Sequence, residues 1–73
     1  MIRIHFYGKL AEQFGRELAL DVPAGTTVAV LRARFEGLDA ARVRALVNDA
    51  LAGEDTEVGA GDRVDFLPPL SGG

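Results

Sequence analysis

The stretch GDRVDFLPPLSGG, residues 61–73, decides most about the fold. Polar and apolar residues alternate over 63–67, which predicts a strand with Val64 and Phe66 on its buried face. Its outward-facing residues are Arg63, Asp65 and Leu67. The two prolines that follow cannot continue the hydrogen bonding of a strand and force an extended exit. The sequence therefore predicts a final strand that leads directly into a short tail.

Two stretches near the N-terminus alternate in the same way, over residues 2–6 and 17–22. The first places Arg3, His5 and Tyr7 on the outward side. Glycines bracket the residues between the two stretches, which suit one helical turn that packs Leu10 and Phe14. We expect the two strands to pair as a hairpin.

One segment has clear helical spacing. Its apolar residues are Val28, Leu31 and Phe35, which recur at i, i+3 and i+7. Thr26 or Thr27 offers a hydroxyl for the N-cap, and Gly37 is placed to end the helix in a left-handed conformation. Arg32 and Glu36 stand four residues apart on the expected polar side, where they can pair.

The remaining segments predict short strands and turns. Residues 38–46 fit either a second short helix or a turn followed by a strand that ends at Val47, and we favour the turn and strand. Asn48-Asp49 suits a two-residue hairpin turn before a brief strand over 50–52. Residues 53–62 are rich in turn formers, with Val58 as the expected buried anchor. The whole order predicts an α+β fold, a mixed sheet with one main helix packed across it.

Composition limits the functional classes. The chain has 73 residues, no cysteine and a net charge of −3, which indicates one small domain without disulfides and argues against a self-contained enzyme. No apolar run is long enough to span a membrane and no secretory signal is visible, so we expect a cytoplasmic protein. The basic residues are scattered rather than gathered on one face, which argues against nucleic-acid binding.

The usual catalytic and ligand-binding motifs are missing. His5 is the only histidine and has no second histidine or cysteine to complete a metal site. Ser71, the only serine, is far along the chain from His5, so a nucleophilic dyad is not expected. The acids at 54, 55 and 57 are interpreted as a solvated loop. We therefore predict no bound metal or cofactor.

The Gly-Gly pair at 72–73 remains to be explained. It could be accidental or a remnant of cloning. Physically, glycines without side chains can thread a narrow channel and present a carboxylate inside another protein's active site. The prolines before them stiffen the base of the tail and reduce the entropy lost on insertion.

Taken together, these residues resemble the ubiquitin-like sulfur carriers of the β-grasp family, and within it the small subunits of molybdopterin synthases. The similarity covers the whole chain. It is carried by residues 1–8, Thr27-Val28, Val47-Asn48 and above all by the aromatic, apolar, Pro-Pro, aliphatic, Ser, Gly-Gly ending. It implies a β-grasp domain over 1–67 and an extended tail over 68–73.

The resemblance also implies a chemistry. An enzyme similar to the ubiquitin-activating enzymes would use ATP to adenylate the carboxylate of Gly73, and a separate sulfur donor would convert it to a thiocarboxylate. The tail would then enter the large catalytic subunit of molybdopterin synthase, in an expected heterotetramer, and give its sulfur to a pyranopterin precursor. The residues implied in tail insertion are Pro68, Pro69, Leu70, Ser71 and Gly72.

The positions that match the family, together with strand parity, suggest a surface that binds partner proteins. Tyr7, Leu51 and Leu67 are expected to face outward near the tail, with Arg63 and Asp65 at the rim. The alternative is that these are scattered exposed residues. The acidic second half of the chain would steer it towards basic partner surfaces.

Two other functions remain open on the sequence alone. One is a related carrier that serves tRNA thiolation, thiamine synthesis or protein conjugation. The other is a β-grasp binding module with an inert tail.

Overall fold

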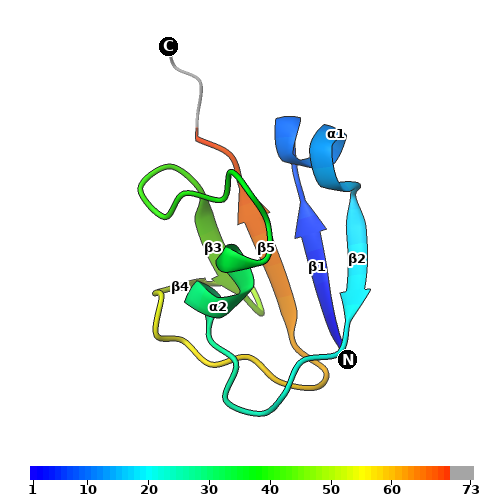
Figure 1. The fold of residues 1–73 in the computed structure, drawn as a ribbon, viewed down its shortest axis with the longest axis vertical. Coiled ribbons are helices and arrows are strands. Elements are labelled where there is room, and N and C mark those ends of the chain that lie inside the picture. The colour runs from blue at the N-terminus through cyan, green and yellow to red at the C-terminus, as the bar shows by residue number, and fades with distance from the viewer. Residues whose placement is uncertain (70–73) are drawn as a thin grey trace.

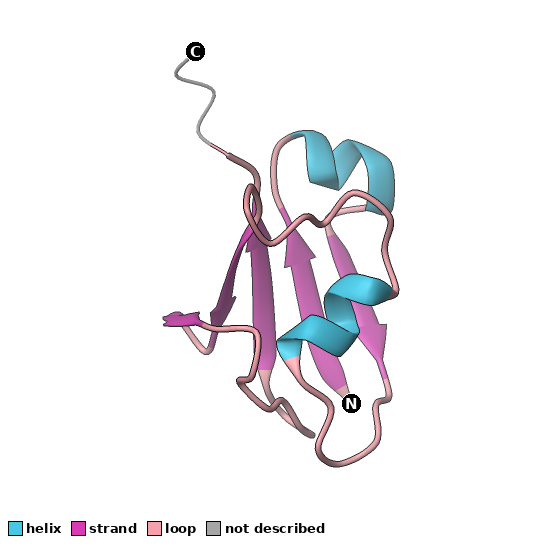
Figure 2. Ribbon diagram, turned by 60° about the vertical axis from the view of Figure 1, so that its left-hand side comes forward, coloured by secondary structure: helices cyan, strands magenta, loops and turns pink. Residues whose placement is uncertain are grey.

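A computed structural model describes residues 1–69 of the chain, and residues 70–73 lie outside the description. Its elements are β1 (Ile2–Phe6), α1 (Lys9–Phe14), β2 (Glu17–Leu20), α2 (Val28–Ala33), β3 (Arg44–Val47), β4 (Ala50–Ala52) and β5 (Arg63–Leu67). The strands form one sheet in the order β2-β1-β5-β3-β4, in which β1 and β5 are parallel and the other pairs antiparallel. α2 lies across one face of this sheet, and α1 lies at the end where β1 and β5 finish (Figures 1 and 2). The predicted α+β mixed sheet with one main helix is confirmed.

The core fills the space between α2 and the sheet. Alternate residues of β1 and β5 point into it together with the apolar face of α2. Phe6 is at its centre, with ring centroids 5.1 Å from Phe14, 5.3 Å from Phe35 and 5.8 Å from Phe66. Aromatic rings at these separations add stabilisation beyond the apolar area they bury.

The main helix is shorter than its spacing predicts. Thr27 is the N-cap, and its side-chain oxygen accepts a hydrogen bond from the amide of Val30 at 3.3 Å. α2 ends at Ala33, after which the amide of Phe35 bonds the carbonyl of Arg32 in a tighter i, i+3 pattern. This turn brings Phe35 against Phe6, so core packing overrides the helical period. Gly37 has the predicted left-handed φ of 94° but lies beyond the helix end.

The remaining predicted strands and turns agree with the structure, with few corrections. Residues 38–43 form a turn before β3, as favoured, and the Asn48-Asp49 hairpin turn has positive φ at both residues. Val58 is buried, as predicted. β2 ends at Leu20 rather than at residue 22. No helix within residues 1–69 is long and apolar enough to cross a membrane.

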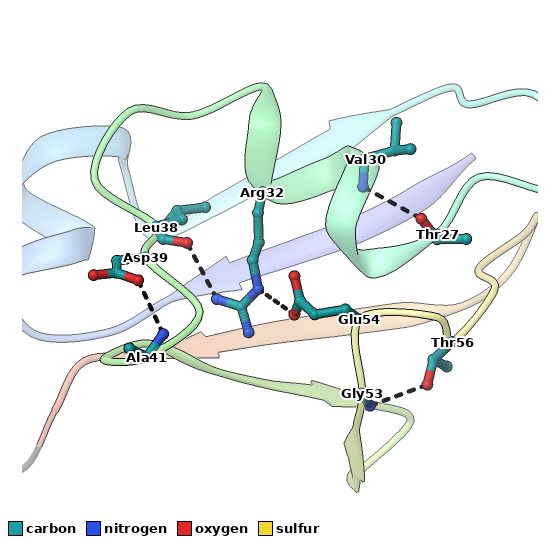
Figure 3. A network of polar contacts seen from close by, with 9 residues as sticks. All are labelled: Thr27, Val30, Arg32, Leu38, Asp39, Ala41, Gly53, Glu54 and Thr56. Carbon is teal, nitrogen blue, oxygen red and sulfur yellow. Dashed lines mark hydrogen bonds and ion pairs between the residues drawn. The ribbon is translucent and has the colours of Figure 1, made fainter.

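Arg32 is the clearest error of the sequence analysis. Instead of pairing with Glu36 on the polar side, its side chain is only 9% exposed. Its Nε lies 2.6 Å from Oε2 of Glu54, and its Nη1 donates to the carbonyl of Leu38 at 3.3 Å (Figure 3). Its guanidinium also lies over the ring of Phe66. A buried guanidinium needs a charged partner, and Glu54 supplies it. Glu54 therefore has a structural role, although we interpreted its loop as merely solvated.

Candidate functional site: the helix-free face and the root of the tail

The face of the sheet opposite α2 carries no helix in the described residues (Figure 2). Strand parity and register determine which side chains share it. Across the middle of the face, Asp65 on β5 pairs with His5 on one side and with Leu46 on the other, and Leu46 pairs with Leu51. Nearer the tail, Leu67 pairs with Arg44.

The three predicted apolar contact residues share this face. Leu51 is 72% exposed, Tyr7 is 38% exposed and Leu67 is half-buried. Leu46, which the sequence analysis missed, stands opposite Leu51 and one strand away from β5. We call Tyr7, Leu46, Leu51 and Leu67 the apolar band, because their register positions run from the edge strand β4 across the sheet to the end of β1.

A signal for Leu46 was present in the sequence. A two-residue turn at Asn48-Asp49 pairs residue 47 with 50 and residue 46 with 51. Leu46 must then lie beside Leu51 on the same face. The uncertainty about residues 38–46 concealed it.

The predicted rim residues form a hydrogen-bonded network with Tyr7. Arg63 donates from Nε to Oδ1 of Asp65 at 3.0 Å and from Nη2 to the hydroxyl of Tyr7 at 3.1 Å. The bond to Asp65, followed by that to Tyr7, holds the pKa of the Arg63 guanidinium above its ordinary value. The two hydrogen bonds therefore fix the position of a positive charge on this face.

Asp65 is not the exposed rim residue that parity predicted. It lies on the helix-free face, but it is only 4% exposed. A short side chain on the central strand is flanked by β1 and β3, and Arg63 binds its carboxylate. The surface of this network is therefore presented by Arg63 and Tyr7, while Asp65 orients Arg63.

The first residue of β5 is also anchored. Asn48 donates to Oδ1 of Asp62 at 3.0 Å and accepts from the amide of Arg63 at 3.0 Å, while the amide of Gly59 donates to Asp62 at 2.8 Å. The bond from Asn48, and then that from Gly59, lowers the pKa of Asp62. These bonds tie the β3–β4 turn to β5 and so hold the register of the two strands.

His5 stands between Glu17 and Asp65 in register, an arrangement that invites the question of a metal site. Within residues 1–69, however, no group of three or more His, Asp or Glu side chains is placed to hold a metal ion.

The root of the tail is held against the start of α1. Gly8, the N-cap of α1, has a φ of 58°, and a Cβ built on it would lie 3.1 Å from Cγ of Pro68. Only glycine combines this backbone conformation with so close an approach. Pro68 is half-buried and Pro69 is exposed, so the chain leaves the body at a defined point. Leu70, Ser71, Gly72 and Gly73 lie outside the described residues.

The model of the ThiS family matches residues 4–73, which is almost the whole chain. The chain belongs to the ThiS family. It is a ubiquitin-like sulfur carrier of the β-grasp fold, as the resemblance implied. The match includes both the helix-free face and the residues of the tail.

Solved structures agree with this assignment. SAMP1 from Haloferax volcanii is 25% identical, with a TM-score of 0.79 over 99% of this chain and 98% of that one. A putative molybdopterin converting factor subunit 1 from Pyrococcus furiosus is 24% identical, with a TM-score of 0.75 over 94% and 97%. A chain in the complex of subunits 1 and 2 of the Helicobacter pylori molybdopterin-converting factor is 24% identical, with a TM-score of 0.66 over 99% and 97%.

Proposed function

We propose that this sulfur carrier is the small subunit of a molybdopterin synthase and the sulfur-donating co-substrate of that enzyme. The observation that carries the proposal is the family match through residue 73, because it includes the Phe-Leu-Pro-Pro-Leu-Ser-Gly-Gly ending. The similarity to converting-factor subunits from two organisms supports it. The β-grasp body, residues 1–67, would present the tail, residues 68–73, to other enzymes.

The proposed chemistry takes place at Gly73. One carboxylate oxygen attacks the α-phosphorus of ATP in an activating adenylyltransferase, and pyrophosphate leaves. Sulfide-level sulfur from a separate donor enzyme then attacks the carbonyl carbon, so that a C–S bond forms and the bond to AMP breaks. In the large subunit the thiocarboxylate sulfur forms a bond to the pyranopterin precursor, and water then cleaves the acyl C–S bond. The sulfur stays on the precursor and the carboxylate of Gly73 returns. The carrier itself binds no cofactor in this scheme.

In this scheme the β-grasp body supplies the surface that binds partner proteins. The apolar band offers a large subunit an exposed leucine and a tyrosine whose hydroxyl is already fixed by Arg63. A rigid aromatic residue and an arginine are the residue types that dominate binding energy at protein interfaces. The Helicobacter pylori protein is in complex with its subunit 2, which supports a large-subunit partner for this chain. The heterotetramer stays a prediction.

The test is the intact mass of the chain after incubation with ATP, a matching adenylyltransferase and a sulfur source. We expect exchange of one oxygen for one sulfur, localised by fragmentation to Gly73. Chains that lack Gly73 or carry one added residue after it are the controls, and both should stay unmodified. The thiocarboxylated chain should then support molybdopterin formation by a large subunit. Normal formation with either control chain would overturn the proposal.

A second candidate is a carrier for another acceptor, such as tRNA, a thiamine precursor or a protein. The observation in its favour is that SAMP1 has the highest TM-score of the three structures compared above. Its test is a denaturing gel after ATP activation in a cell extract. A covalently linked species of higher mass that requires Gly73 would favour conjugation over molybdopterin synthesis.

A binding module with an inert tail is the remaining candidate. Deletion of residues 70–73 separates it from both carriers, because only an inert tail is dispensable. Full activity of the shortened chain would favour it.

A further inference from the structure

A groove runs beside the root of the tail. It is lined by the segment that leads into β3, including Arg42 and Arg44, and by Leu67, Pro68 and Pro69. Because its lining includes the first two tail residues, the groove lies where the tail leaves the body. The groove shares Leu67 with the apolar band, but its two arginines have no role in the band.

The groove carries two positive charges that no carboxylate within residues 1–69 pairs with. Arg3, Arg32 and Arg63 each pair with a carboxylate, whereas within residues 1–69 neither Arg42 nor Arg44 forms an ion pair. Both are exposed. Two unpaired cations in one groove, on a chain with a net charge of −3, are a local exception to its acidic character.

The backbone that carries these arginines is held in place. Asp39 shapes the turn before them, since its Oδ1 accepts from the amide of Ala41 at 3.0 Å and its carbonyl accepts from the amide of Arg42 at 2.9 Å. The buried guanidinium of Arg32 binds the carbonyl of Leu38 at the start of the same turn (Figure 3).

Two further anchors follow. Val43, between the two arginines, is buried, and Arg44 is paired in β3 with Leu67. Arg42 lies in the turn and Arg44 in β3, and both line the groove. Because these bonds and pairings fix the backbone that carries the two arginines, less entropy is lost when their side chains bind.

We propose that this groove docks an acidic segment of the activating adenylyltransferase, with at least two Asp or Glu side chains that pair with Arg42 and Arg44. The inference rests on the proposed function. A planar guanidinium binds a carboxylate through two parallel hydrogen bonds, and two guanidinium groups line this groove. The groove therefore favours carboxylates.

The activating enzyme is a better candidate than the large subunit for binding in the groove, for a kinetic reason. A carrier that is charged by one enzyme and used by another must leave the first one quickly. Exposed charge pairs speed association and are weakened by salt, while apolar contacts chiefly slow dissociation. We therefore assign the charged groove to the short encounter and the apolar band to the longer one.

The test is carrier-dependent exchange of labelled pyrophosphate into ATP by the adenylyltransferase. The variant is Arg42→Glu with Arg44→Glu, and the matched control is Arg16→Glu with Arg34→Glu, two exposed arginines outside the groove lining. Both doubles change the net charge equally. We expect KM for the carrier to rise about tenfold in the groove variant alone, with kcat within about twofold of the unchanged chain. The KM of the unchanged chain should also rise more steeply with salt concentration than the KM of the groove variant.

The outcomes are separable. The milder Arg42→Gln with Arg44→Gln variant should give a smaller rise of the same sign, and thermal unfolding checks that each variant is folded. Exchange by the unchanged chain with equal KM values for the groove and control variants overturns this inference and leaves the proposed function standing. Absence of any exchange with the unchanged chain, while the enzyme works on another carrier, overturns both.

Discussion

The two faces of the five-stranded sheet are built from alternate residues of the same strands, yet only one is completed within the chain. On β5, Val64 and Phe66 are fully buried beneath α2, while Arg63 and Leu67 lie on the face without a helix. The covered face is apolar and closed by aromatic rings. The other face joins an apolar band to a fixed arginine and leaves Leu51 almost fully in solvent. The comparison teaches that stability and partner contact are divided between the faces.

The largest expected effect comes from opening the covered face. Phe6→Ala removes the ring that meets three other aromatic rings and should lower the free energy of unfolding by about 3–5 kcal/mol. Leu51→Ala on the other face should cost less than about 0.5 kcal/mol. Urea denaturation of both variants measures this. Similar losses for the two would show that the faces are not divided in this way.

The point where the tail leaves the body gives the next effect. Gly8→Ala should lower the free energy of unfolding by about 1–3 kcal/mol, because the new Cβ meets Pro68 and the backbone is strained. Adding Pro68→Ala should restore part of the loss. Gly61→Ala is the control, since Gly61 also has positive φ but open space around it. No recovery in the Gly8→Ala, Pro68→Ala double would mean that backbone strain alone is responsible.

Affinity for the large subunit should depend on one of two exposed apolar residues that lie on opposite faces, and not on the other. Leu51→Ala should weaken affinity for the large subunit about tenfold, because a leucine of the apolar band no longer enters the interface. Val30→Ala is the matched control, since Val30 is 52% exposed but lies on α2. Isothermal titration calorimetry with the large subunit measures both. Equal loss in the two variants would count against the apolar band as the contact surface.

The smallest effect concerns acid stability. The pKa of Asp62 is lowered in the folded chain by Asn48 and Gly59, so its contribution is present above the unfolded carboxyl pKa of about 3.9 and is lost as the pH falls through the lower folded value. Asp62→Asn should therefore flatten the decline in stability below about pH 4. Thermal unfolding between neutral and acidic pH detects this, and an unchanged acid limb would contradict it.

Much of the fold could be predicted because alternation and turn chemistry are local. The strands over 2–6 and 63–67 and the Asn48-Asp49 turn were all found from neighbouring residues. The errors lie where distant segments meet. α2 stops early because Phe35 turns towards Phe6, and no helical period contains that information.

The candidate site shows the same division. Parity alone grouped Arg63, Asp65 and Leu67 on one face, and the turn at 48–49 would have added Leu46. Their burial could not be predicted, since it depends on which strands flank β5. The contact between Arg63 and the hydroxyl of Tyr7 joins residues 56 positions apart, and the groove at Arg42 and Arg44 needs the tail root beside it.

The sequence by itself determined the family, the order of elements along the chain and the residues offered at the tail, because those depend on short-range patterns and on a distinctive ending. The order of the strands within the sheet came from the structure. Only the tertiary structure decided that Arg32 is buried against Glu54, that Asp65 is covered, and that Pro68 packs on Gly8. The physical reason is that burial and pairing are set by whatever the fold brings within a few ångströms. For a chain of 73 residues, those neighbours come mainly from other strands and loops.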